Sequence, residues 1–136
     1  MSHKIIRSLF EMRLAAWAAD RELRVAYQGV NFTPNSDETY VSAFVLPAGT
    51  STETLAGDHR VYTGVFQINV VTPVGNGTGD AEGLVDELAE LFPAFLRLKQ
   101  DDFEVIVLTP VEPGPPITGD TTLTVSASFQ YRADTE

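Results

Sequence analysis

The fold is decided by residues 60–72, RVYTGVFQINVVT, in which apolar and polar side chains alternate. One face of this stretch carries Gln67 and Asn69, and the other carries Tyr62, Phe66, Ile68 and Val70. A period of two residues is typical of a strand that is buried on one face only. Gly64, in the middle of the stretch, indicates either a bulge or the close approach of another part of the chain.

Two amphipathic helices flank this strand in the sequence. The first is predicted from about residue 3 to about residue 19, where apolar residues recur at helical spacing: Ile6, Phe10, Leu14 and Trp17. The second follows a loop at residues 73–79, with Asp80 or Thr78 as its N-cap. Pro93 ends or kinks it, because proline lacks the backbone donor. We expect one core that contains Trp17, Phe66, Leu88 and Phe92.

Four further strands are predicted, at residues 25–27, 40–46, 103–109 and 121–131. Pro47 is expected to end the second of them, which leaves a long polar connection at residues 48–59. The element order is therefore α-β-β-β-α-β-β. Because alternating strands face a core on one side only, we predict a single α+β domain over residues 1–136. Its sheet is mainly antiparallel, and two helices pack on it.

The composition of the 136-residue chain excludes several classes of protein. It has no cysteine, which excludes disulfides, thiolate metal sites and a catalytic cysteine. No apolar run approaches the ~20 residues of a membrane span, and charges interrupt the N-terminus, so we expect a soluble protein that is not exported. The net charge is -10, and only the first 24 residues carry an excess of basic side chains. We therefore expect most of the surface to repel nucleic acid.

The sequence contains no arrangement of residues that is typical of an enzyme site. Gly75, Gly77 and Gly79 lie between a strand and a helix, but their spacing differs from a dinucleotide-binding fingerprint and no P-loop lysine follows. Acidic residues also stand where a phosphate would bind. His3 and His59 do not have the spacing of a metal pair. We expect no catalytic residue, no cofactor and no metal, and we interpret the glycines as a structural turn.

The central strand and several other segments resemble a known family. The stretch YTGVFQINVVTPVGNGT, residues 62–78, leads into a helix that ends in Leu91, Phe92 and Pro93. Together with the N-terminal helix and segments 31–34, 41–47 and 129–132, it is similar to the phage tail terminator-like family, also described as minor tail or tail-completion proteins. Residues 95–101 depart from the family pattern, because helix or turn is expected to continue there past Pro93.

The resemblance implies a structural virion protein rather than an enzyme. It implies a ring of six subunits that sits on the last ring of tail-tube subunits, stops tube growth and presents the surface to which the head is joined. The implied partners are further copies of the chain, the tail tube protein and the head-completion protein, with no membrane and no sequence-specific nucleic acid. The implied location is the head-proximal end of the virion tail, after assembly in the cytoplasm of the bacterial host.

Two other interpretations stay open from the sequence. A head-completion or neck connector protein would use similar ring assembly on the other side of the joint. A small phosphate-binding or ligand-binding domain would use the glycine turn, or would close the loop of residues 49–59 over its ligand.

The predicted interaction surface combines the basic start of the first helix with the polar connection after Pro47. Basic side chains attract an acidic face of a partner. The connection is too polar to be buried in an isolated subunit, so we expect it to be mobile there and to order against a neighbour. The predicted contact residues are Lys4, Arg7, Thr50, Ser51, Thr52, Glu53, Thr54, Leu55, Asp58, His59 and Arg60.

Overall fold

The computed structural model describes residues 3–52, 60–75, 77–100 and 103–134. Within these residues the chain forms two α-helices and eight β-strands. Their bounds are α1 His3–Asp20, β1 Arg24–Tyr27, β2 Tyr40–Thr52, β3 Arg60–Pro73, α2 Gly79–Leu91, β4 Arg97–Gln100, β5 Phe103–Val107, β6 Glu112–Pro113, β7 Ile117–Thr118 and β8 Thr122–Asp134. The longer elements follow the predicted order, and the short strands β4, β6 and β7 are additions to it.

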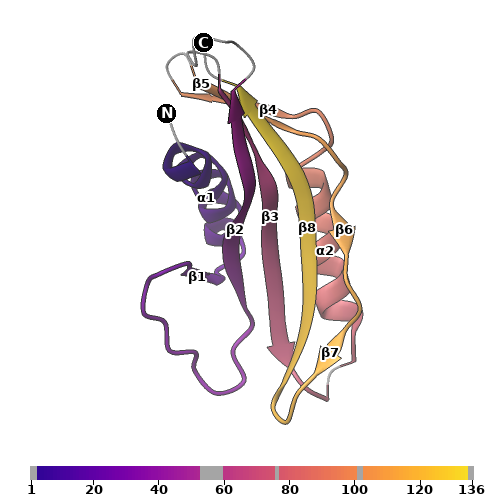
Figure 1. Ribbon diagram of the computed structural model, residues 1–136. Coiled ribbons are helices and arrows are strands. Elements are labelled where there is room, and N and C mark those ends of the chain that lie inside the picture. Colours follow the sequence, from indigo (N-terminus) through magenta and orange to yellow (C-terminus); the bar gives the residue numbers. More distant parts are fainter. Residues whose placement is uncertain (1–2, 53–59, 76, 101–102, 135–136) are drawn as a thin grey trace.

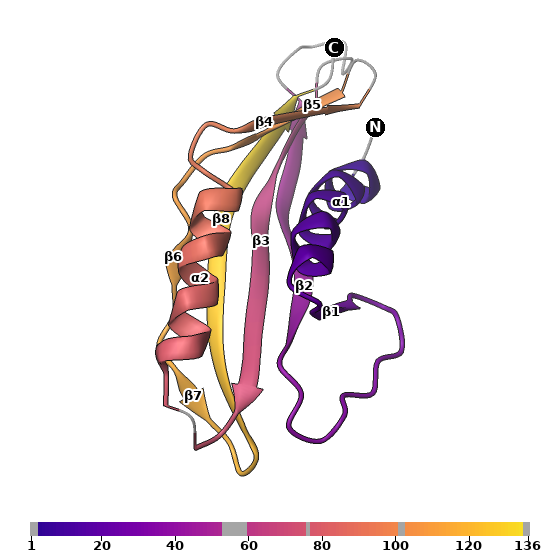
Figure 2. The ribbon, with the colours of Figure 1, turned by 180° about the vertical axis from the view of Figure 1, so that it is seen from behind.

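The strands form one sheet in the order β1-β2-β3-β8-β5-β4, with β6 and β7 also paired with β8. β1 and β2 run parallel, and the other described pairings are antiparallel. Three long strands, β2, β3 and β8, run the length of the molecule (Figure 1). Both helices lie on the same face of this sheet, in front of it in Figure 2. The predicted α+β class, mainly antiparallel with two helices on the sheet, is confirmed.

The prediction that Pro47 ends its strand is wrong, because β2 continues to Thr52. Pro47 pairs with Gly64 and Gly49 pairs with Thr63, so the register shifts by one residue between them. A bulge of this kind accommodates a proline, which has no backbone N–H to donate to the ladder. Beyond the bulge, pairing resumes and continues to Thr52 and Arg60. The predicted connection therefore shortens to residues 53–59, which lie outside the described residues.

The chain after α2 also differs from the prediction. Pro93 does end the helix: α2 stops at Leu91, and the backbone N–H of Phe92 donates to the carbonyl of Leu88 at 3.0 Å. Residues 97–100 are not a continued helix or turn, however, but the edge strand β4, antiparallel to β5. The sequence RLKQ has one apolar residue and no alternation to mark it as a strand. Its extended form is set by pairing with β5.

Five aromatic rings form the centre of the core between the helices and the sheet. Phe10 of α1 lies with its ring centroid 5.0 Å from that of Phe66 and 5.2 Å from that of Phe129. Phe92 lies 5.1 Å from Phe129, and Tyr131 lies 5.6 Å from Phe10. Trp17 and Leu88 belong to the same buried cluster as these rings. The expected shared core of Trp17, Phe66, Leu88 and Phe92 is therefore confirmed.

Gly64 makes the close approach that its place in the strand predicts. It pairs directly with Tyr131, and a β-carbon at this position would lie 2.7 Å from both the Tyr131 ring and the carbonyl oxygen of Leu46. The Tyr131 hydroxyl is 2.8 Å from Nδ1 of His3, and burial raises the pKa of Tyr131 to about 12. Burial and then the charge of Arg7 lower the pKa of His3. Because Gly64 has no side chain, the Tyr131 side chain of β8 can lie against it and contact His3 at the start of α1.

Candidate interaction surface

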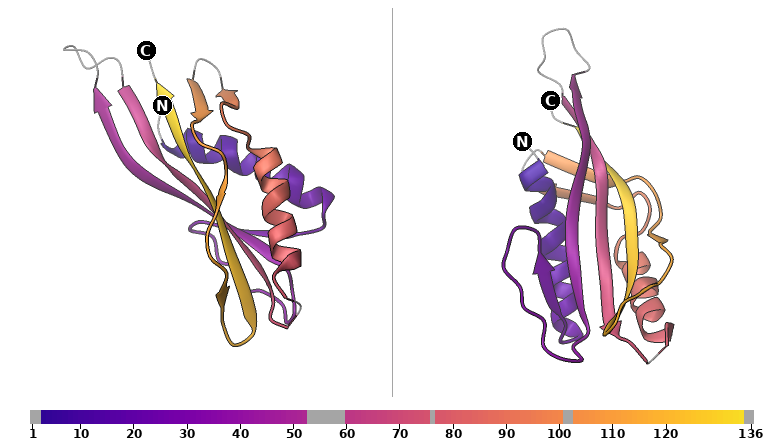
Figure 3. Two further views of the ribbon diagram at one scale, coloured as in Figure 1. Left: turned by 90° about the vertical axis from the view of Figure 1, so that its right-hand side faces the viewer. Right: turned by 60° about the horizontal axis from the view of Figure 1, so that its bottom comes forward.

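The predicted contact residues that the structure describes lie on three elements, at one end of the molecule. Lys4 and Arg7 are in the first turns of α1, and residues 50–52 form the last part of β2. Arg60 opens β3, paired with Thr52, and residues 53–59 lie outside the described part of the chain. The start of α1, the end of β2 and the start of β3 lie at the same end in Figures 1 and 3. The arrangement is compatible with one shared surface.

The glycine turn lies at the opposite end of the long strands, between β3 and α2. Gly75 and Gly77 have φ of 103° and 76°, and a β-carbon on either would meet open space. Thr78 is the N-cap of α2 but makes no side-chain capping bond, and the first turn of the helix carries Asp80 and Glu82. These carboxylates offset the positive end of the helix dipole and repel another anion, so the turn is a poor site for a phosphate.

Alanine in place of Gly75 is expected to lower the free energy of unfolding by about 1 kcal/mol, because a β-carbon disfavours a positive φ. The same loss is expected for Gly77→Ala, since the space around both residues is open and only the backbone angle is at issue. Chemical denaturation measures this loss. Calorimetry with ATP or NAD should show no binding to the unmodified protein. A saturable heat of binding, or alanine variants as stable as the parent, would contradict the structural interpretation of the turn.

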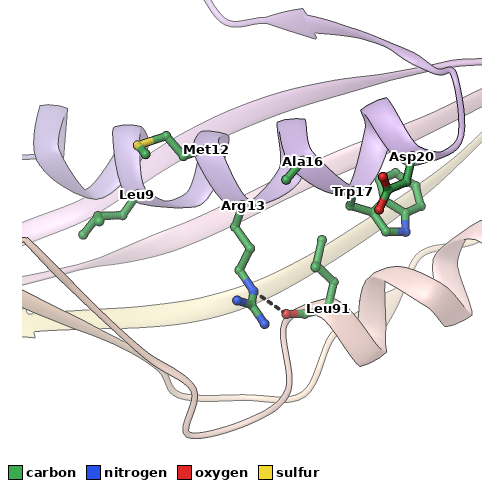
Figure 4. A pocket seen from close by; sticks show the side chains of 7 residues that line it. All are labelled: Leu9, Met12, Arg13, Ala16, Trp17, Asp20 and Leu91. Carbon is green, nitrogen blue, oxygen red and sulfur yellow. Dashed lines mark hydrogen bonds between the residues drawn. The ribbon is translucent and has the colours of Figure 1, made fainter.

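A groove of about 530 Å³ runs between α1 and the end of α2 (Figure 4). It is lined by Leu9, Met12, Arg13, Ala16, Trp17, Asp20 and Leu91. Arg13 crosses it and donates from Nε to the carbonyl of Leu91 at 2.7 Å. A cation at the C-terminal end of a helix satisfies a free carbonyl and favours the helix dipole. This groove is therefore partly closed by a contact that holds the two helices together.

A second groove, of about 460 Å³, lies on the other side of α1, between the helix and β1. Its lining is mostly apolar and includes Lys4, Arg7, Ser8, Glu11, Met12, Ala15, Tyr27, Gln28 and Val30. Met12 is 67% exposed and Val30 63% exposed, so two large apolar side chains border the groove in contact with solvent. Exposed apolar side chains around a hollow are typical of a contact surface.

Gln28 fixes the wall of this second groove. Its Oε1 accepts from the backbone N–H of Val45 at 3.0 Å and from Nη2 of Arg7 at 3.3 Å. Partial burial raises the pKa of Glu11 and that of Tyr27. At the start of β1, hydrogen bonds from Arg24 lower the pKa of Glu38 to about 2. Polar contacts thus hold β1 and the chain around it in place beside α1.

The outward face of α2 is strongly acidic. Asp80, Glu82, Asp86 and Glu90 are exposed on it. Within the described part of the chain, the ion pair of this helix joins Glu87 to Arg21, and the four exposed carboxylates have none. Carboxylates in a row repel one another and attract a cationic partner. This face is therefore suited to contact a basic surface and unsuited to contact a second copy of itself.

The middle of the sheet face away from the helices carries polar, uncharged side chains. A polar network crosses it, in which Asn69 Oδ1 accepts from Gln67 Nε2 at 2.9 Å and from Ser126 Oγ at 2.8 Å. Arg132 and Asp134 pair with each other near the end of β8. Leu46, 47% exposed, lies at an outward position of β2. Among the described residues, the ion pair Arg21–Glu87 involves α2, whereas Arg24–Glu38, Arg97–Glu104 and Arg132–Asp134 lie on strands and loops.

The described residues offer no obvious chemistry. Among them, no group of three or more His, Asp or Glu side chains is placed to hold a metal ion. In the same part of the chain, no helix has the length and apolar content needed to cross a membrane. The two grooves beside α1 are lined by apolar, polar and charged side chains. The features found are those of a contact surface.

Sequence reasoning missed two of the exposed apolar residues. In α1, Met12 lies outside the spacing of the buried residues Ile6, Phe10, Leu14 and Trp17, and it is 67% exposed. Phe95 follows Pro93 in a turn and is 71% exposed. The position of Met12 outside the buried stripe of α1 predicts that it is exposed. No comparable pattern in the sequence predicts the exposure of Phe95.

Comparisons with known proteins extend over nearly the whole chain. A sequence model of the family described as phage tail terminator protein matches residues 5–131. A solved structure of a chain with 45% sequence identity superposes with a TM-score of 0.83, covering 98% of this chain and 96% of the other. A search of curated proteins gives no match. The family match begins within α1 and ends within β8, so it takes in the acidic helix face and the lining of both grooves except Lys4.

Proposed function

Because the chain belongs to the phage tail terminator protein family, we propose that it caps the finished tail tube as a ring of six subunits. Family membership makes it a structural protein of the phage tail, and the match over residues 5–131 is the observation that carries the proposal. In this role the ring ends tube polymerisation and presents the surface to which the head is joined. Its partners are further copies of the chain, the tail tube protein and the head-completion protein.

The proposed position is the head-proximal end of the virion tail, reached after assembly in the host cytoplasm. We propose that residues 1–136 act there as one terminator domain without catalytic activity. The net charge of -10 supports this position, because an acidic channel wall lets DNA pass without retaining it.

The charge distribution also supports a ring. A ring of identical subunits closes through two different patches, one on each side of the subunit. The acidic face of α2 and the basic start of α1, with Lys4 and Arg7, are two such patches. Opposite charges favour contact between different patches over contact between equal ones. The arrangement therefore favours head-to-tail association.

Tube growth in vitro tests the proposed capping. Purified tail tube protein is polymerised with and without this protein, and tube lengths are measured by electron microscopy. We expect added protein to stop elongation, with rings seen at the tube ends. Tubes of unchanged length at saturating protein would contradict the proposal. A protein that binds head-completion protein but not tubes would instead be a neck component.

The end of the molecule that carries Lys4, Arg7 and residues 50–60 is proposed to contact the tube or a neighbouring subunit. Replacing residues 53–59 with Asn-Gly should leave the fold intact, because Thr52 pairs with Arg60 and a two-residue turn suits such a hairpin. We expect an unchanged melting transition and loss of length control. A variant with residues 53–59 in scrambled order is the matched control for length. Normal capping by the shortened variant would show that this segment makes no essential contact.

A further inference from the structure

Phe95 is held in a conformation that its own side chain disfavours. Its φ is 70°, in the left-handed region, and its side chain is 71% exposed. A bulky residue is rare in that region, and strain of this kind persists only where the surrounding structure enforces it. Burial of the ring in this chain does not account for the strain.

Backbone hydrogen bonds hold Phe95 in place. Its N–H donates to the carbonyl of Val107 at 2.7 Å, and the N–H of Val107 donates to the carbonyl of Leu96 at 2.9 Å. The N–H of Leu96 donates to the carbonyl of Pro93 at 3.1 Å. The connection between α2 and β4 is thus tied to the sheet, so the aromatic side chain projects from a fixed support. A rigid aromatic side chain costs little entropy when it docks.

The groove between α1 and β1 lies at the opposite edge of the molecule. β1 is the first strand in the order of the sheet, and β4, which follows Phe95, is the last. Figures 1 and 2 agree that α1 with β1 and α2 with the connection to β4 lie on opposite sides. A contact between these two places on different copies is heterologous, and repeating it builds a ring.

The surroundings of Phe95 and those of the groove between α1 and β1 are complementary. The acidic face of α2 ends shortly before Phe95, and Glu90 is exposed in its last turn. The groove is bordered by the exposed apolar side chains of Met12 and Val30, and Lys4 and Arg7 also line it. Glu11 is part of the lining as well, so two basic side chains stand beside one carboxyl group. Phe95 and the groove thus each combine apolar surface with nearby charge, acidic beside Phe95 and basic at the groove.

We propose that Phe95 of one copy docks into the groove between α1 and β1 of a second copy. The inference rests on the proposed ring and names the contact that builds it. In this contact Phe95 becomes buried and acts as an aromatic anchor. Around it, the acidic face of α2 of one copy faces the basic start of α1 of the other.

Cross-linking tests the contact directly, because the chain has no cysteine of its own. Ala94→Cys and Ala15→Cys are combined in one chain, Ala94 being the small neighbour of Phe95 and Ala15 a small residue of the groove lining, so that the Phe95 side chain is kept. A short thiol-reactive linker should then give a ladder of dimers, trimers and larger products. Each single-cysteine variant should stay monomeric on the gel. Dimers from Ala94→Cys alone would show contact between equal edges and would overturn the proposal.

The reaction is run on capped tubes and, separately, on concentrated free protein. Failure of the unmodified chain to cap tubes counts against the proposed function, and the ladder from free protein still decides the docking. Capped tubes of normal length without any ladder, on tubes or free, would overturn the docking and leave the proposed function standing.

Phe95→Gly separates anchoring from folding. Glycine relieves the backbone strain, so we expect a higher melting temperature. The protein concentration needed to cap tubes should rise at least about tenfold for the same variant, as expected when an aromatic anchor is lost. Leu46→Ala, another exposed apolar residue but on the outer sheet face, is the matched control and should cap normally. Unchanged capping by Phe95→Gly would overturn the proposal, as would rings that form normally but fail to bind tubes.

Discussion

Replacing Phe92 with alanine is expected to lower the free energy of unfolding by about 3–5 kcal/mol. Phe92 is fully buried at the end of α2, with ring centroids 5.1 Å from Phe129, 5.9 Å from Phe66 and 6.0 Å from Phe10. Removing the ring leaves a cavity between both helices and the sheet, and the rigid strands cannot close it. Urea denaturation measures the loss.

Phe95→Ala is the matched control, because it makes the same change three residues further along the chain. Phe95 is 71% exposed, so its truncation should change the free energy of unfolding by no more than about 0.5 kcal/mol. A loss of less than about 0.5 kcal/mol for Phe92→Ala would show that the central aromatic cluster does not stabilise the fold as described.

Alanine at Gly64 is expected to lower the free energy of unfolding by about 1–3 kcal/mol, as is typical of overpacking. The new β-carbon would meet the Tyr131 ring and, at 2.7 Å, the carbonyl oxygen of Leu46. Neither can move away freely, because Tyr131 is buried and bonded to His3 and Leu46 is paired with Val65. The strands must therefore separate or Tyr131 must leave its place.

Gly83→Ala provides a control of opposite sign. Gly83 is exposed within α2, its φ is not positive, and a β-carbon there meets open space. Alanine at such a helical position should stabilise the protein by about 0.5–1 kcal/mol. If Gly64→Ala were as stabilising as Gly83→Ala, the close approach of Tyr131 would not exist in solution.

The elements that could be predicted from the sequence are those that carry their own pattern. Alternation over residues 60–72 predicted β3, and the helical spacing of Ile6, Phe10, Leu14 and Trp17 predicted α1. β4, β6 and β7 have no such pattern, since each is two to four residues long and is extended only because a neighbouring strand pairs with it. Pairing with a neighbour also explains why β2 continues beyond Pro47, because its pairing with β3 resumes after the bulge.

The contact surface could be predicted only in part. Lys4 and Arg7 stand out in the sequence because most basic residues lie in the first 24 positions of an acidic chain. Phe95 does not stand out, because its exposure and its positive φ depend on a hydrogen bond to Val107 in a distant strand. The groove beside α1 likewise exists only once β1 has packed against the helix.

The central claim is that this protein forms the ring that caps the head-proximal end of the tail. Electron cryomicroscopy of tails purified from the phage, with reconstruction of that end, tests it most directly. We predict density for six copies of the chain stacked on the last ring of tube subunits, with the α2 edge of each copy against the α1 edge of the next. Tails that lack the protein at this end, or that carry it only on the head side of the joint, would contradict the claim.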